Sequence, residues 1–167
     1  MILKENTGQI AIEFIFLISL IIILSLISIN FIESENELNI ALLAAKEGIV
    51  EGIMIDSSAI YPKSSYDDYE EDKPNLLKPN SIQLNKIIIK SSEYDSKYNK
   101  TKIQLQVHVT SETVNEKKDQ DSLGDRINFN LRKAISETYN TSDLTNSLYN
   151  PSHSNKYIFT TANVVWS

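Results

Sequence analysis

The longest apolar run in the chain extends from Phe14 to Ile32, and its 19 residues include no charge. As a helix it would be roughly 28 Å long, close to the roughly 30 Å hydrocarbon core of a bilayer. Serines within the run can return hydrogen bonds to the preceding turn, so lipid tolerates them. The run therefore predicts a transmembrane helix. The alternative, a buried helix of a soluble domain, seldom extends this far without a charge.

A secretory signal peptide would have a shorter apolar region followed by a small-x-small cleavage site. Here Ile32 is followed by Glu33, Ser34 and Glu35. We therefore expect the apolar segment to remain in the mature protein.

The charges that flank the apolar run predict its orientation. Lys4 and the amino terminus lie before the run, whereas Glu33 and Glu35 follow it. Because positive charges favour the cytoplasmic side of a membrane, a cytoplasmic N-terminus is expected.

Beyond the apolar run, the helical pattern continues with an apolar stripe on one face. Its members recur at spacings of four, three, four and four residues: Leu38, Leu42, Ala45, Ile49 and Ile53. Gly48 and Gly52 form a small-xxx-small pair, which would let another helix approach closely. The pair could equally mark a bend, because Gly costs about 1 kcal/mol in a helix. Residues 10–57 are thus expected to form one long helix, with its membrane part at about 10–32.

Residues 58–80 contain Pro62, Pro74 and Pro79 and an acidic run over 67–72. This composition predicts a solvated surface loop, and a cation-binding or partner-binding loop is the less favoured interpretation. The chain is therefore expected to divide into a long helix that ends at about residue 57 and a soluble head over residues 58–167.

The head has the pattern of a small α+β domain. Thr101–Thr110 alternates apolar and polar residues, and with Ser81–Ser91 it predicts an antiparallel pair with one wet face. Ser122–Tyr139 has apolar residues at spacings of four, which predicts a helix capped by Asp121 or Ser122. A polar loop over 140–155 and a final strand over 156–166 complete an antiparallel sheet with one helix.

Composition excludes several classes of function. The chain has 167 residues, a net charge of −6 and no cysteine. The acidic balance argues against nucleic acid as a partner, because nucleic-acid binding needs clustered Lys and Arg. The absence of cysteine excludes a disulfide framework, a thiolate metal site and a Cys nucleophile.

No pattern in the chain indicates an enzyme. The segment Asp119–Gly124 begins like a calcium loop, but Leu123 stands where an oxygen ligand is required and Asn130 where a glutamate is required. A loop capping the next helix is therefore favoured. His108 is expected to face solvent, and His153 has no ligand pattern near it. We therefore expect no catalytic residue, no metal site and no cofactor.

Two tripeptides, Asn99-Lys100-Thr101 and Asn140-Thr141-Ser142, are N-glycosylation sequons. Both should lie in surface loops. If the head is exported, Asn99 and Asn140 are reasonable acceptors, and the alternative is unmodified polar loops.

The start of the chain carries one further motif: Gly8, Gln9, Glu13 and Phe14 immediately precede the apolar run. This arrangement resembles an archaeal type IV prepilin with a class III signal peptide. In that family the leader ends in Gly, the mature chain begins with Gln, and Glu is its fifth residue. Ala11 replaces the frequent Ser. The resemblance covers about the first thirty residues and implies cleavage by a prepilin peptidase between Gly8 and Gln9. Residues 1–8 would then be the leader, and residues 9–57 the long helix of the mature chain.

The resemblance implies a role for Glu13, which would meet the N-terminal amine of a neighbouring subunit during assembly, with Phe14 beside it. The simpler alternative is a carboxylate that reaches back to water. The implied partners are membrane lipid before assembly, the peptidase and other pilin subunits. The implied location is the cell membrane with the head outside, followed by a surface filament.

The size of the head suggests a minor pilin or an adhesin-like subunit. The alternative function is an uncleaved single-pass membrane-anchored surface protein whose head binds a ligand or a partner subunit. It rests on Glu5-Asn6-Thr7, because class III leaders are usually basic before the cut. A membrane-tethered enzyme has no positive support in the sequence.

Overall fold

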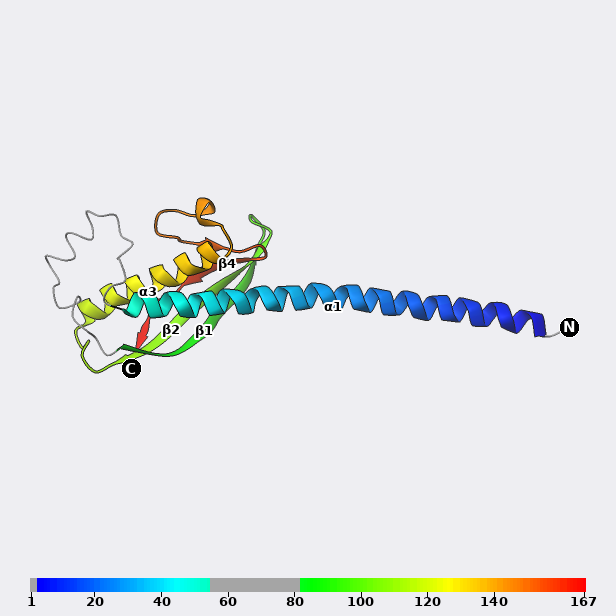
Figure 1. Cartoon of the computed structure of the whole chain (residues 1–167), viewed down its shortest axis with the longest axis horizontal. Helices are drawn as coiled ribbons and strands as arrows, with labels where there is room; N and C mark the ends of the chain where they lie inside the picture. The colour runs from blue at the N-terminus through cyan, green and yellow to red at the C-terminus, as the bar shows by residue number, and fades with distance from the viewer. Residues whose placement is uncertain (1–2, 55–81) are drawn as a thin grey trace. The chain divides into compact units, whose positions relative to one another are not determined.

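The computed structural model of the chain describes residues 3–54 and 82–167, with side chains described from Ile10 onward (Figure 1). The expected loop over 58–80 therefore lies outside the described residues. Helix α1 comprises Leu3–Ile53. The chain divides into two compact units, residues 1–37 and residues 38–167.

The first unit is the N-terminal part of α1, and it is long and apolar enough to cross a membrane. Its polar side chains bond to the helix itself, as the sequence predicts. The hydroxyls of Ser19, Ser25 and Ser28 each donate to the carbonyl oxygen four residues earlier, at 2.8 Å. The amide of Asn30 donates to the Leu26 oxygen at 3.1 Å. These groups can therefore sit in an apolar environment without losing a hydrogen bond.

The second unit contains a sheet, a second long helix and the C-terminal part of α1. In chain order its further elements are β1 (Ile82–Asp95), β2 (Lys100–Ser111), α3 (Lys117–Thr138), the short 3-10 helix η2 (Ser142–Leu144), β3 (Ser152–His153), β4 (Tyr157–Thr161) and β5 (Val165–Trp166). The α+β class predicted from the sequence is confirmed for this part of the chain.

The sheet is mixed, so the expected antiparallel sheet is wrong in part. The strand order is β1-β2-β4-β3, and β5 also pairs with β2. The β1–β2 and β3–β4 pairs are antiparallel, whereas β4 and β5 both run parallel to β2. Parallel neighbours need a crossover connection, and α3 provides it between β2 and β4.

Several predicted boundaries are also corrected. Helix α3 begins five residues before the expected Ser122, so the expected cap at Asp121 or Ser122 is wrong, and Asp119–Gly124 is helix instead of a loop. The residue at its N-cap is Glu116, whose side chain makes no capping bond. The expected final strand is interrupted between β4 and β5, and the expected loop over 140–155 contains η2 and β3.

One hydrophobic core joins β2, α3 and the C-terminal part of α1. It includes the apolar face of β2 and the four-residue repeat of α3, as expected: Ile103, Leu105, Val107, Val109, Leu123, Ile127, Leu131 and Ile135. The predicted stripe of α1 is confirmed, because Ala45 and Ile49 are fully buried and Leu38, Leu42 and Ile53 pack against the core.

The two glycines of α1 lie against α3, which confirms the close-approach interpretation. A Cβ at Gly48 would lie 2.8 Å from the Cβ of Ala134 and would overlap the backbone oxygen of Asn130. A Cβ at Gly52 would lie 2.9 Å from the Cα of Ile127. The helix continues through both glycines to Ile53, so they mark a packing surface.

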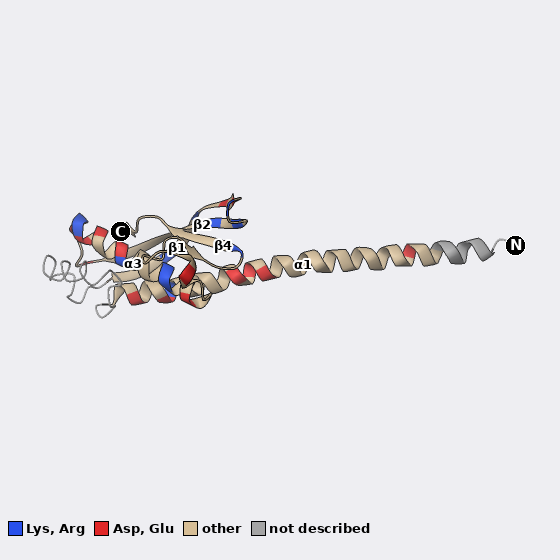
Figure 2. Cartoon of the chain, turned by 90° about the horizontal axis from the view of Figure 1, so that it is seen from above, with Lys and Arg blue, Asp and Glu red and all other residues tan. Residues whose placement is uncertain are grey.

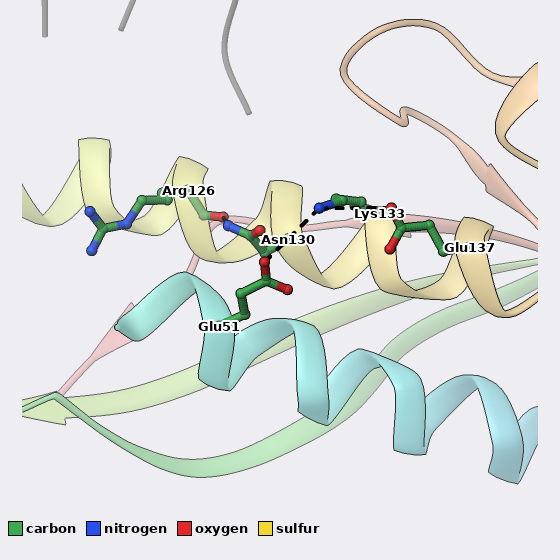
Figure 3. Close-up of polar contacts among 5 residues, drawn as sticks. All are labelled: Glu51, Arg126, Asn130, Lys133 and Glu137. Atoms are coloured by element: carbon green, nitrogen blue, oxygen red, sulfur yellow. Dashed lines mark hydrogen bonds and ion pairs between the residues drawn. The ribbon is translucent and has the colours of Figure 1, made fainter. Parts of the chain in front are cut away.

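Polar contacts also join α1 to α3, and Figure 3 shows the ion pair between Glu51 and Lys133. The Nε of Arg126 donates to the backbone oxygen of Gly52 at 2.8 Å, in a buried position near the end of α1. The Lys133 ammonium lies 3.9 Å from the Glu51 carboxylate and 3.7 Å from that of Glu137. The Arg126 bond satisfies one of the carbonyls that a helix C-terminus leaves without a partner in the helix.

Replacing Gly48 by Ala tests the close approach, and Gly124→Ala is a matched control. At Gly124 the added Cβ would lie 3.4 Å from the nearest atom, a Val164 Cβ, which is ordinary contact. Both changes gain helix propensity, but only Gly48→Ala forces two helices apart. We expect Gly48→Ala to be less stable than Gly124→Ala by about 1–3 kcal/mol. Thermal unfolding of the full chain in detergent measures this, and equal stability of the two variants would contradict the packing.

Candidate functional site

The first candidate site is the start of α1, where Gly8, Gln9, Glu13 and Phe14 lie in a single continuous helix. Residues four apart lie on the same face, one turn along the helix. Glu13 is therefore one turn beyond Gln9. Its side chain is exposed between those of Ile12 and Phe14, which are also exposed. The arrangement places a carboxylate at the beginning of an apolar surface.

That surface extends along α1 to Ile32 and surrounds the helix. The consecutive residues Ile21, Ile22, Ile23 and Leu24 are all 53–55% exposed. Because successive residues are about 100° apart around the axis, these four positions cover every side. Figure 2 shows the same length of α1 as an uncharged stretch between acidic positions. A helix that is apolar all round needs lipid or other helices around it.

Both sequon asparagines are exposed and have left-handed backbone conformations, each with φ of 53°. Asn99 lies in the turn between β1 and β2, and the Tyr94 hydroxyl donates to its side-chain oxygen. Asn140 follows α3, where its N–H donates to the Glu137 oxygen and that of Thr141 donates to the Ser136 oxygen. These two bonds form a Schellman cap, which favours Gly or Asn. The exposure of Asn99 and Asn140 is compatible with glycosylation. Their left-handed backbone conformation is a separate reason for asparagine at these two positions, because Asn tolerates it better than most residues.

His108 is not on a fully solvated face, so that prediction is wrong. The side chain is half-buried on β2, beside β1 at Lys86 and beside β5 at Val165. Its Nε2 atom is buried and has no hydrogen-bond partner among the described residues. The parallel pairing of β5, which the sequence pattern did not predict, accounts for this burial.

His153 is only 4% exposed and lies on β3, next to Lys100 and Tyr98. The Lys100 ammonium donates to the Ser154 backbone oxygen at 2.6 Å. Burial, followed by the positive charge of Lys100, lowers the pKa of His153 below its ordinary value of 6.5. Within residues 10–54 and 82–167, no group of three or more His, Asp or Glu side chains is arranged to hold a metal ion.

The second candidate site arises from an irregularity between β4 and β5. Leu105 pairs with Thr161 and His108 with Val165, so three steps along β2 match four steps along the C-terminal segment. The extra residue makes a bulge over residues 162–164. Its backbone is held by side chains, because Asn128 donates to the Ala162 oxygen at 3.0 Å and Gln106 donates to the Asn163 oxygen at 3.2 Å. Bulges of this kind redirect side chains and are common beside binding sites.

Two adjoining cavities lie between this bulge and α3, and together we name them the α3 groove. Their volumes are about 290 and 310 Å³, and both are lined by Asp125, Asn128 and Asn163. The first is further lined by Lys117, Gln120, Asp121, Gly124, Val164 and Trp166, and the second by Phe129, Arg132, Leu148, Asn150 and Thr161. Sequence reasoning missed this site, since the polar face of α3 has the pattern of an ordinary solvated helix.

The lowered pKa of His153 predicts a loss of stability as the pH falls. Well above pH 6.5 the imidazole is neutral in both the folded and the unfolded state. Below that value the unfolded chain takes up a proton that the folded chain resists, so the free energy of unfolding decreases until the folded pKa is passed. We expect thermal unfolding of the full chain in detergent to shift to lower temperature between about pH 7.5 and pH 5.5.

The comparison variant is His153→Gln, which keeps a polar side chain but cannot titrate in this range. Its unfolding temperature should depend less on pH than that of the native chain, whatever its absolute stability. Equal pH dependence of the two proteins would contradict the assignment to His153.

No protein-family model, no curated protein and no solved structure matches this chain.

Proposed function

We propose that the chain is a structural subunit of an archaeal type IV pilus-like surface filament, in the role of a minor pilin or adhesin-like subunit. It would assemble after a prepilin peptidase cuts between Gly8 and Gln9. The observation that carries the proposal is the exposed apolar surface of α1 over residues 14–32, which begins beside Glu13.

The apolar surface supports assembly because it would contact lipid before assembly and neighbouring helices afterwards. Before assembly, lipid would surround the helix, whose length matches a bilayer. After assembly, neighbouring copies of the same helix would replace the lipid. A helix that is apolar on every side suits a bundle in which it is surrounded, whereas a helix that pairs along one seam needs only one apolar stripe.

Glu13 supports assembly because an ionised carboxylate is costly to enclose in an apolar environment. Breaking a buried ion pair by removing one partner costs about 3–5 kcal/mol, while a well-paired carboxylate is tolerated. Cleavage after Gly8 would create an α-ammonium on Gln9, at the same end of the helix. The ammonium of one subunit could then pair with Glu13 of its neighbour, and the cost of an unpaired Glu13 would favour correct axial register.

The head supports a role beyond forming the filament core. The second compact unit has its own hydrophobic core and includes the C-terminal part of α1. Such a unit would project from a filament and remain available for contacts. Lys4 before the apolar run and acidic residues after it favour a cytoplasmic N-terminus and a head outside the cell.

Substituting Glu13 tests this function. In the producing cells, Glu13→Ala should remain in the membrane fraction but fall by at least about tenfold in filaments sheared from the surface, because the neighbouring ammonium would lose its partner. Glu13→Gln should behave similarly, since it removes the charge and keeps the size. Quantitative immunoblotting of the two fractions measures the ratio.

Glu35→Ala is the matched control, because Glu35 is an exposed carboxylate of the same helix outside the apolar run. It should assemble like the native chain. If Glu13→Ala and Glu35→Ala reach the filament fraction equally, the assembly role of Glu13 is wrong. If the native chain never leaves the membrane fraction, the uncleaved single-pass anchor becomes the better description.

A further inference from the structure

We propose that the α3 groove is a binding site for a neutral sugar residue. The inference concerns the head alone and does not depend on whether α1 enters a filament. It rests on the shape of the groove, its hydrogen-bonding groups, its balance of charge and its aromatic side chain.

The shape fits a small ligand. The two cavities have volumes of about 290 and 310 Å³. Small-molecule sites begin at about this size. Because the cavities adjoin at Asp125, Asn128 and Asn163, the groove could hold one sugar ring with a second ring beside it.

The base of the groove contains a buried amide that is only partly used. Asn128 is 7% exposed, and its Nδ2 donates to the Ala162 backbone oxygen. Its Oδ1 has no hydrogen-bond partner in the described part of the chain. A buried acceptor without a donor costs about 1–3 kcal/mol, so such groups in native proteins call for an explanation. Because this oxygen is itself closed to solvent, a ligand hydroxyl in the groove would reach it only as the lining side chains adjust around the ligand.

The surrounding side chains can both donate hydrogen bonds to sugar hydroxyls and accept hydrogen bonds from them. Asp121 offers carboxylate oxygens that accept, and Asn163 offers an amide that both donates and accepts. The Nε2 of Gln120 already donates to the Val114 backbone oxygen at 3.0 Å, and the Gln120 side-chain oxygen is a further acceptor. Each sugar hydroxyl is itself a donor and an acceptor, and neighbouring hydroxyls suit two-atom groups such as carboxylates and amides. Asn163 is exposed and stands on the bulge that separates β4 from β5.

The charges favour a neutral ligand. The groove is lined by two cations, Lys117 and Arg132, and by two anions, Asp121 and Asp125, so its formal charges cancel. A strongly charged ligand would therefore gain little from the groove as a whole. A purely apolar ligand is disfavoured as well, because burying the polar lining without hydrogen bonds is costly.

Trp166 brings an aromatic side chain to the groove. It is half-buried on β5, packs against the core and lines the first cavity. The negative face of an aromatic ring attracts the weakly positive C–H groups on one face of a sugar ring. An aromatic side chain among carboxylates and amides suits the two-sided chemistry of a sugar, which has apolar faces and a polar rim.

Trp166 is the only tryptophan in the chain, so its fluorescence reports directly on the groove. The experiment titrates the full chain, held in a zwitterionic detergent without a sugar headgroup, with glucose, galactose, mannose and N-acetylglucosamine. Glucosamine and glucuronate serve as cationic and anionic comparisons. Saturation-transfer NMR on the sugar protons provides a second readout that does not depend on tryptophan.

We expect a saturable change in Trp166 emission, with matching NMR signals, for at least one neutral sugar. Asn163→Ala and Asp121→Ala should each weaken that binding about tenfold, as expected for a lost hydrogen bond to a partly buried ligand. Asn155→Ala and Asp143→Asn are matched controls, because both residues are exposed and neither lines the groove. Circular dichroism and thermal unfolding establish that all four variants fold.

Three results would overturn the proposal: no saturable binding of any neutral sugar in either readout, binding that only the charged sugars show, or binding that Asn163→Ala and Asp121→Ala leave unchanged. None of these results bears on filament assembly, which the Glu13 variants test separately.

Discussion

The structure depends on one constraint: the apolar side chains over residues 10–32 of α1 must be shielded from water by lipid or by other helices. Their exposure on every side of the helix would be strongly unfavourable in water. From Leu38 onward the same helix carries a one-sided stripe and contributes to the core of the head. One continuous helix thus has a segment suited to lipid or other helices and a segment suited to a folded domain, which is the property required of a subunit that leaves a membrane for a filament.

Close packing of α1 against α3 connects that helix to the rest of the head. Gly48 and Gly52 leave room for the backbone of α3, and Arg126 closes the end of α1 with a buried hydrogen bond. Helix α3 in turn crosses from β2 to β4 and so makes these strands parallel neighbours. The bulge before β5 then opens the α3 groove beside the helix. The features that support the proposed filament role and the proposed sugar site therefore share one scaffold.

Much of this scaffold could be predicted from residue patterns, because burial follows periodicity. The stripe from Leu38 to Ile53 and the alternation on β2 both identify their buried faces correctly. The first turn of α3 was missed because residues 117–121 include no apolar residue and the N-cap, Glu116, makes no side-chain bond. The division of the last strand was missed because a one-residue bulge depends on pairing with β2, which the sequence of that strand alone does not determine. The groove was missed for the same reason, since it needs Asn128 and Asn163 to be brought together.

The central claim is that residues 1–8 are removed and that α1 then packs with other subunits in a filament. The most direct test is the mass of the N-terminal peptide. The peptide should be taken from natively expressed protein recovered from membranes and sheared filaments. The account predicts a terminus at Gln9, with residues 1–8 removed and a free amine one helical turn from Glu13. A peptide that still contains residues 1–8 in both fractions would contradict it and would leave Glu13 as an interfacial carboxylate of an uncleaved anchor.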